Sequence, residues 1–312
     1  MAEIARTSFR FSSPVLGEVD LPSFDVHGDS DGPTLAVIAG VHGCEYSSIA
    51  AVGDLVDSLE GQRVAGRVIA IPVVNRTAFT TRTPFVTPED GKNLNRCFPG
   101  RPDGSYSEAL AHHVFEVISR CDYLVDLHGG DLVEALEPFV LYDESPVGDS
   151  ARAMAKAFGL PYAICAPRAE RIEGTTVAAA ADAGIPAMVA EAGGRGLLED
   201  DARRALAGGV ENVMRSVGML PDAPPAAASA TTLFRRFLWL YAPAEGWWEP
   251  AVRVGDTVEA GALVGTVRTV LGEELERIVA PDGGVVLFMT SVPPVAENGI
   301  LMGLGVDASP LR

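Results

Sequence analysis

The feature that most constrains the fold is an alternation of short apolar runs with longer amphipathic stretches between residues 34 and 217. The apolar runs are typical of buried β-strands, and the amphipathic stretches are typical of helices. Strands that alternate with helices favour a largely parallel sheet whose two faces are both covered. The sequence therefore predicts an α/β fold with a mixed, mostly parallel sheet. We expect strands at 34–40, 67–74, 123–128, 138–142 and 185–193, and helices at 46–59, 105–120, 149–158, 174–183 and 200–218.

The two ends of the chain lack this alternation of apolar runs and amphipathic stretches. Residues 1–33 predict a short pair of strands, and 219–230 reads as a Pro- and Ala-rich linker. Residues 231–312 consist of short β-type runs broken by Gly, Pro and Asp. We therefore expect a catalytic α/β domain at 1–222 and a C-terminal β domain at 223–312. The stretch VRVGDTVEAGALVGTV resembles the half-barrel of biotinyl and lipoyl carriers, but the C-terminal part lacks the lysine that a carrier needs.

Composition excludes several classes of partner. The chain has 24 Lys+Arg against 42 Asp+Glu, a formal net charge of -18, which argues against binding to nucleic acid or to an anionic membrane. The N-terminus does not resemble a signal peptide, and no apolar run approaches the ~20 residues that span a bilayer. A cytoplasmic location is expected. The four cysteines are scattered and form no CxxC, so we expect free thiols.

Three polar side chains fall at the ends of predicted strands, where parallel sheets place their chemistry: His42, His128 and Glu191. Glu45 follows His42 at a three-residue spacing, a pattern that is common by chance and also fits an ordinary polar turn. Catalytic zinc prefers three nitrogen and oxygen ligands, and His42, Glu45 and His128 would supply them. The alternative for His128 is a hydrogen-bonded histidine of the core.

The remaining histidines are expected to be surface or packing residues. His112 and His113 are neighbours on a predicted helix and point in different directions. His27 lies in the N-terminal strand pair, where we expect no carboxylate partner.

Four motifs, in order, carry a resemblance to a known family. They are GVHGCE (40–45), NLNRCFPG (93–100), YLVDLHGGD (123–131) and AEAGG (190–194). Together they resemble the zinc-dependent succinylglutamate desuccinylase/aspartoacylase group of the metallocarboxypeptidase-like (M14-type) superfamily, over most of residues 15–300.

The resemblance implies a role for each matching residue. His42, Glu45 and His128 would bind one Zn²⁺, and Asn95 and Arg96 would hold the substrate carboxylate. Glu191 would act as general base toward a zinc-activated water. For the arginine that polarises the scissile carbonyl, Arg82 is the candidate, with Arg76 behind it. Tyr241 is a candidate for the family's late tyrosine.

The implied activity is hydrolysis of the amide bond of a small N-acyl amino acid or a related small amide. Asp131 and Glu134 follow His128, and if either faces the substrate it favours a cationic amine; the alternative is a solvated acidic turn. Two other functions stay open. One is a zinc carboxypeptidase acting on peptides, and the other is a metal-free, non-catalytic binding protein. The sequence leaves open whether the chain forms a homo-oligomer.

Overall fold

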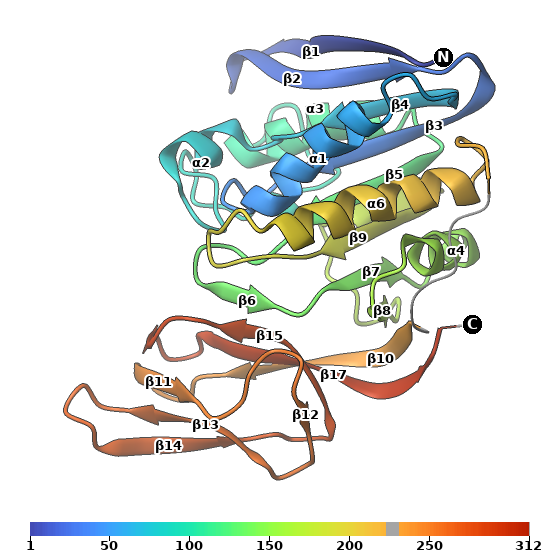
Figure 1. Ribbon diagram of the computed structural model, residues 1–312. Coiled ribbons are helices and arrows are strands. Elements are labelled where there is room, and N and C mark those ends of the chain that lie inside the picture. Colours follow the sequence, from blue (N-terminus) through green and yellow to red (C-terminus); the bar gives the residue numbers. More distant parts are fainter. Residues whose placement is uncertain (223–230, 312) are drawn as a thin grey trace.

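The computed structural model describes residues 1–222 and 231–311. Within these residues thirteen strands form one large mixed sheet (Figure 1). Its central part is parallel, because β4 (Ala65–Ile71), β3 (Ser30–Ala39), β5 (Tyr123–His128) and β9 (Ala187–Glu191) pair in that order. The predicted strands at 34–40, 67–74, 123–128 and 185–193 are confirmed.

Near both edges of the sheet some strand pairs are antiparallel, so the sheet is less uniformly parallel than the sequence predicts. On one side β1 (Glu3–Ser13) and β2 (Gly17–His27) form an antiparallel hairpin that pairs with β4. On the other side β7 (Phe139–Asp143) runs antiparallel to β9 and parallel to β8 (Tyr162–Ala166). The carboxyl ends of β7 and β8 therefore point in the direction opposite to the carboxyl ends of β5 and β9.

Two helical layers cover the two faces of the sheet. Helices α1 (Tyr46–Ser58), α4 (Gly148–Phe158) and α6 (Asp200–Ser216) pack on one face, and α3 (Tyr106–Ile118) and α5 (Thr176–Asp182) on the other. Alternate residues of β3 enter opposite cores: Val37 packs with the first layer and Ile38 with the second. A strand buried on both faces reads as a continuous apolar run, which is why the sequence identifies it.

Helix boundaries agree closely with the sequence. The Ser105/Glu108 capping box opens α3, and the Glu108 carboxylate accepts the Ser105 N–H at 2.8 Å. The sequence predicts neither β8 nor the short elements α2 (Arg76–Thr81), the 3-10 helix Leu94–Arg96 and β6 (Glu134–Leu136). The helices and β6 are too short to show a period. No helix of the described ranges is long and apolar enough to cross a membrane.

The C-terminal part continues the main sheet. Strand β10 (Thr232–Tyr241) pairs parallel with β8, and β17 (Ile300–Pro310), β15 (Gly284–Thr290) and β12 (Thr257–Val258) follow antiparallel. The short strand β6 (Glu134–Leu136) also pairs with β15. A second sheet contains β14 (Glu274–Val279), β13 (Leu263–Arg268), β11 (Gly246–Pro250) and β16 (Pro294–Val295).

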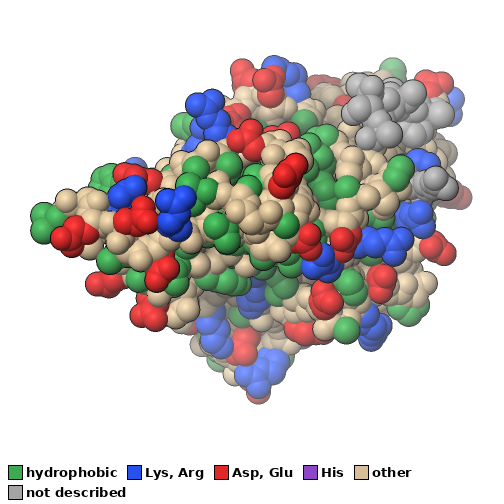
Figure 2. All heavy atoms as spheres, turned by 90° about the horizontal axis from the view of Figure 1, so that it is seen from below, with side chains coloured by type: hydrophobic (Ala, Val, Ile, Leu, Met, Phe, Trp, Pro, Cys, Tyr) green, Lys and Arg blue, Asp and Glu red, His purple; other side chains and the backbone are tan. Residues whose placement is uncertain are grey.

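The β13–β14 hairpin projects from the body of the molecule in Figure 1, and Figure 2 shows acidic and basic side chains interspersed on the face below. The half-barrel resemblance of this part stays a prediction.

The predicted linker is only partly described. Met219 and Leu220 are buried against the helical core, so the start of 219–230 belongs to the α/β body. The predicted boundary between 222 and 223 adjoins residues 223–230, which lie outside the described residues.

Candidate metal centre

Two neighbouring parallel strands, β3 and β5, and the start of helix α1 bring the predicted ligands to one edge of the sheet. His42 follows β3, His128 is the last residue of β5, and Glu45 precedes α1 as its N-cap. The turn that carries His42 and Glu45 needs a glycine, because a Cβ on Gly43 would lie 2.2 Å from the backbone nitrogen of Phe79 in α2. Backbone packing therefore fixes the path of the ligand-bearing loop.

The two imidazole rings converge on one carboxylate. His42 Nδ1 lies 2.7 Å from Glu45 Oε1, and His128 Nδ1 lies 3.1 Å from Glu45 Oε2. One ligand atom from each of the three residues falls within 4.8 Å of the other two. The structure thus brings together the three residues that the sequence predicts as metal ligands.

The outward nitrogens of both rings face oxygen acceptors. His42 Nε2 is 3.1 Å from Asn93 Oδ1, and His128 Nε2 is 3.0 Å from Asp126 Oδ2. A hydrogen on His42 Nε2 that is donated to Asn93 would leave the Nδ1 atom of His42 as the ligand atom facing Glu45, whereas His128 Nε2 has no hydrogen-bond partner among the described residues. Metal-binding histidines in proteins are oriented by partners of this kind.

The electrostatics of Glu45 fit a cation at this place. Although burial raises the pKa of the Glu45 carboxyl, the positive charges of His128 and His42 lower it to about 2, so the group is ionised. Its Oε2 atom is buried and accepts no hydrogen bond from the described residues. A buried carboxylate oxygen beside two imidazole nitrogens is a donor set suited to a divalent transition metal, which would take the place of the ring protons, so the residues present fit such an ion.

A buried hydrogen-bond network supports this cluster. The hydroxyl of Thr176, at the start of α5, donates to Asp126 Oδ2 at 2.5 Å, and the Thr176 N–H donates to Asn95 Oδ1 at 3.0 Å. Asn93 accepts the Asn95 N–H at 2.8 Å. One residue, Thr176, therefore links the carboxylate behind His128 to the loop of Asn95 and Arg96.

Glu191 lies beside the cluster, because it ends β9 directly opposite His128 in the parallel register. Burial raises the pKa of its carboxyl well above the ordinary value, the charge of His128 opposes this rise, and the nearby carboxylates Glu45 and Glu134 add to it. A carboxyl with a raised pKa next to a metal site is suited to accept and return a proton.

Asp131, in the turn after β5, and Glu134, the first residue of β6, are both buried. The two carboxylate oxygens of Asp131 accept the N–H groups of Phe85, at 2.7 Å, and Leu132, at 2.6 Å. Glu134 accepts the Asp131 N–H through Oε2 at 2.9 Å. Burial raises the pKa of Glu134 to about 8, and the charges of Glu45 and Asp131 contribute to this rise. Asp131 thus anchors the segment around Phe85, whose ring centroid is 5.6 Å from that of His42.

The predicted arginines occupy different settings. Arg96, in the short 3-10 helix Leu94–Arg96, is exposed and donates through one guanidinium nitrogen to the Asn95 carbonyl at 2.6 Å. Arg82 is exposed at the end of α2 with a left-handed φ of 54°. Arg76 donates to the Asp20 carbonyl of β2 at 2.6 Å, and Tyr241 is exposed in β10.

Other polar groups lie outside this cluster. His112 and His113 form a second group with Glu116 on α3, where His113 stacks on Phe11 with ring centroids 4.4 Å apart. The expectation that His27 lacks a carboxylate partner is wrong, because its Nε2 lies 3.2 Å from Asp25 Oδ1, two residues away on the same strand.

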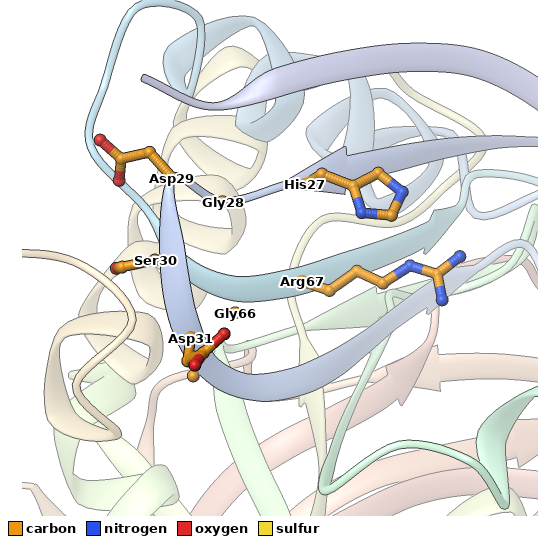
Figure 3. Close-up of a pocket in the computed structure, with 8 residues that line it drawn as sticks. His27, Gly28, Asp29, Ser30, Asp31, Gly66 and Arg67 are labelled. Atoms are coloured by element: carbon orange, nitrogen blue, oxygen red, sulfur yellow. The ribbon is translucent and has the colours of Figure 1, made fainter.

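A hollow of about 560 Å³ lies at the β2–β3 turn between His27 and Arg67 (Figure 3). Arg67 is already held by Asp25 through two bonds of 2.7 and 2.6 Å, so its guanidinium is occupied within the fold.

Sequence reasoning missed three residues of the site: Asn93, Thr176 and Phe85. Asn93 stands two positions before Asn95 in NLNR, so its motif carried a signal. Thr176 and Phe85 lie in segments without any motif, and only the tertiary structure brings them to the cluster.

Comparisons with known proteins agree with the motifs. Residues 31–217 match the family described as the succinylglutamate desuccinylase/aspartoacylase catalytic domain. An N-alpha-acetyl-L-2,4-diaminobutyric acid deacetylase of Halomonas elongata is 32% identical over 251 residues, which cover 76% of this chain and 71% of that protein.

Solved structures show the same fold over nearly the whole chain. A succinylglutamate desuccinylase/aspartoacylase from Rhodobacter sphaeroides has a TM-score of 0.84 at 26% identity and covers 98% of this chain and 95% of its own. The product-bound ectoine utilization protein EutE (DoeB) from Ruegeria pomeroyi has a TM-score of 0.85 at 24% identity, with the same coverage. The chain belongs to the succinylglutamate desuccinylase/aspartoacylase family.

Proposed function

We propose that the protein is a zinc-dependent deacylase that hydrolyses the amide bond of a small N-acyl amino acid. The observation that carries this proposal is the His42–Glu45–His128 cluster with Glu191 directly opposite His128 in the sheet. Zinc held by these three residues would supply a Lewis acid that polarises the acyl carbonyl and acidifies water.

The protein's own residues would carry the proton and position the substrate. Glu191 takes a proton from the attacking water and returns it to the nitrogen of the departing amine. Its raised pKa supports this role, because a more basic carboxylate binds the proton more tightly. Asn95 and Arg96 hold the substrate carboxylate through an amide donor and a planar guanidinium fork. Arg82 stabilises the developing oxyanion.

For the substrate, we propose an N-acetyl amino acid whose side chain carries a second, cationic amine. Glu134 supports this choice, since the described residues give its Oε1 no hydrogen-bond donor, and an ammonium group beside it would lower its raised pKa and pair with the resulting carboxylate. The Halomonas elongata relative, which is named for such a substrate, supports it as well. Asp131 serves the site differently, by anchoring the Phe85 segment with both oxygens.

The test of the catalytic proposal combines metal analysis with turnover. The purified protein should contain one zinc per chain, lose acetate release from Nα-acetyl-L-2,4-diaminobutyrate after chelation, and regain it on zinc addition. Glu191→Gln should keep the zinc and lose most turnover. Activity that survives in this variant would remove Glu191 from the mechanism, and faster cleavage of peptides than of acyl amino acids would favour a carboxypeptidase.

Substrate selection has its own test in Glu134→Gln. We expect kcat/KM for the diamino substrate to fall about 10- to 100-fold, the effect of losing a hydrogen bond to a charged group. N-acetyl-L-alanine, which lacks the second amine, should be hydrolysed at an unchanged rate. Glu137→Gln is the matched control, because Glu137 directly follows β6, three positions after Glu134, but lies against Gly255 of the C-terminal part. Equal losses for both substrates would refute selection by charge.

A further inference from the structure

A second cavity lies on the opposite edge of the sheet from the metal centre. It has a volume of about 450 Å³ and is formed by the carboxyl ends of β7 and β8, the start of α4 and the start of β10. Parallel sheets bind ligands beyond the carboxyl ends of their strands. Because β7 and β8 run antiparallel to β9, their carboxyl ends lie at this second cavity and not at the metal centre.

The cavity contains polar groups that the fold leaves unsatisfied. Asp143 is only 5% exposed, and its Oδ2 atom accepts no hydrogen bond from the described residues. The buried Oγ of Ser145 has no hydrogen-bond partner among the described residues, and the buried Nε–H of Arg152 donates to none of them. Buried polar groups in proteins are normally paired, so three orphaned atoms on the wall of one cavity indicate a ligand that supplies the partners.

The charges on the wall have both signs. Arg152 and Arg235 line the cavity, and neither forms an ion pair with a residue in the described part of the chain. Neighbouring arginines are engaged: Arg171 pairs with Asp182 and Arg236 with Asp282. Asp143 stands among the same lining residues, with Glu144 and Asp149 nearby. A phosphate dianion would meet the two arginines but also three carboxylates, and a simple amine would leave the arginines unpaired.

We propose that this cavity binds a free α-amino acid, with its carboxylate held by Arg152 and Arg235 and its ammonium group held by Asp143. Only a small zwitterion satisfies both kinds of charge at once, and the volume is sufficient for an amino acid of ordinary size. The site is separate from the His42–Glu45–His128 cluster and uses none of its residues.

Cys165 gives a direct local readout, because it lines the cavity and is partly buried. We suggest measuring its alkylation by iodoacetamide with mass spectrometry, in the whole protein with its metal. L-2,4-diaminobutyrate or L-alanine, at about ten times its dissociation constant, should slow the reaction of Cys165 about tenfold. Acetate and ethylammonium, which each carry one of the two charges, should not. Cys97 lies outside the cavity, on the loop that follows Arg96, and reports separately on the metal centre.

Two variants test the assignment of the charges. Arg235→Gln changes an exposed residue, so the fold is expected to remain intact, and amino acid binding should weaken about tenfold. Arg253→Gln, an exposed arginine elsewhere in the C-terminal part, should leave protection of Cys165 unchanged. The proposal is overturned if no amino acid protects Cys165, if acetate protects it equally well, or if Arg235→Gln behaves as Arg253→Gln does. The readout requires no turnover, so a failure here and a failure of the deacylase proposal are distinguishable.

Discussion

Replacing Asp143 by asparagine should stabilise the protein above pH 6 and leave its stability unchanged at pH 4. Burial raises the pKa of Asp143 from 3.8 to about 6; the charge of Arg171 opposes this rise, and Glu173 and Asp182 add to it. An acid with a higher pKa in the folded state favours folding only while it is protonated. The stability that depends on its proton is complete below pH 4 and is lost as the pH rises through 6.

The expected size follows from the change in pKa. A rise from 3.8 to about 6 corresponds to about 3 kcal/mol of free energy of unfolding. The side chain is 5% exposed, so solvent screening reduces this value little. Asparagine has nearly the same shape and no charge to bury, so Asp143→Asn should gain about 3 kcal/mol at pH 8.

Urea unfolding at pH 4, 6 and 8 measures this difference. The gap between the variant and the parent protein should open between pH 4 and 6 and then stay constant. Glu144→Gln changes the exposed neighbour and should shift the free energy of unfolding by about 0.5 kcal/mol or less. If Asp143→Asn lowers the stability equally at every pH, Asp143 has a partner within the fold, and the reasoning about its orphaned carboxylate is refuted.

Three further predictions concern the candidate metal centre. Thr176→Val keeps the buried volume but removes the hydrogen bond to Asp126, so the affinity for zinc should fall about 10- to 100-fold in a competition titration. An unchanged affinity would contradict the proposal that Thr176 and Asp126 position His128. Asp131→Asn replaces one of the two side-chain oxygens that accept the N–H groups of Phe85 and Leu132 by an NH2 donor, at a cost of about 1–3 kcal/mol. The Phe85 amide should then exchange hydrogen faster, and the KM for the acyl amino acid should rise while the zinc content stays normal. Unchanged exchange would show that the Phe85 segment is held by other contacts. Gly43→Ala places a Cβ 2.2 Å from the Phe79 nitrogen and should abolish most turnover and zinc binding, whereas Gly53→Ala, on open helix surface, should not; equal behaviour of the two variants would show that the ligand loop can shift.

The two candidate ligands His42 and His128 were predictable because each stands at or just after the end of a strand that the sequence marks clearly. The runs 34–40 and 123–128 are largely apolar, so the positions of His42, just after the first run, and of His128, at the end of the second, follow from the parallel arrangement. Glu191 follows from the third such run. Motif order then tied Asn95 and Arg96 to the same edge of the sheet.

The supporting contacts were not predictable, because they join segments far apart in the chain. Thr176 reaches Asp126 across 50 positions, and Phe85 reaches Asp131 across 46. No local period or spacing encodes such pairs. The antiparallel direction of β7 escaped prediction for a similar reason, since a short apolar run gives no information on strand direction. That reversal is what creates the second cavity.

The pairing of β10 with β8 has a consequence for the integrity of the α/β body. In a chain shortened at residue 222, β8 would be the last strand on its side, and the backbone N–H and C=O groups that now bond to Thr232–Phe234 would face water. An unprotected strand edge recruits strands from other molecules, so the shortened protein should aggregate. The C-terminal strands therefore cover the edge of β8 and prevent strand pairing between molecules.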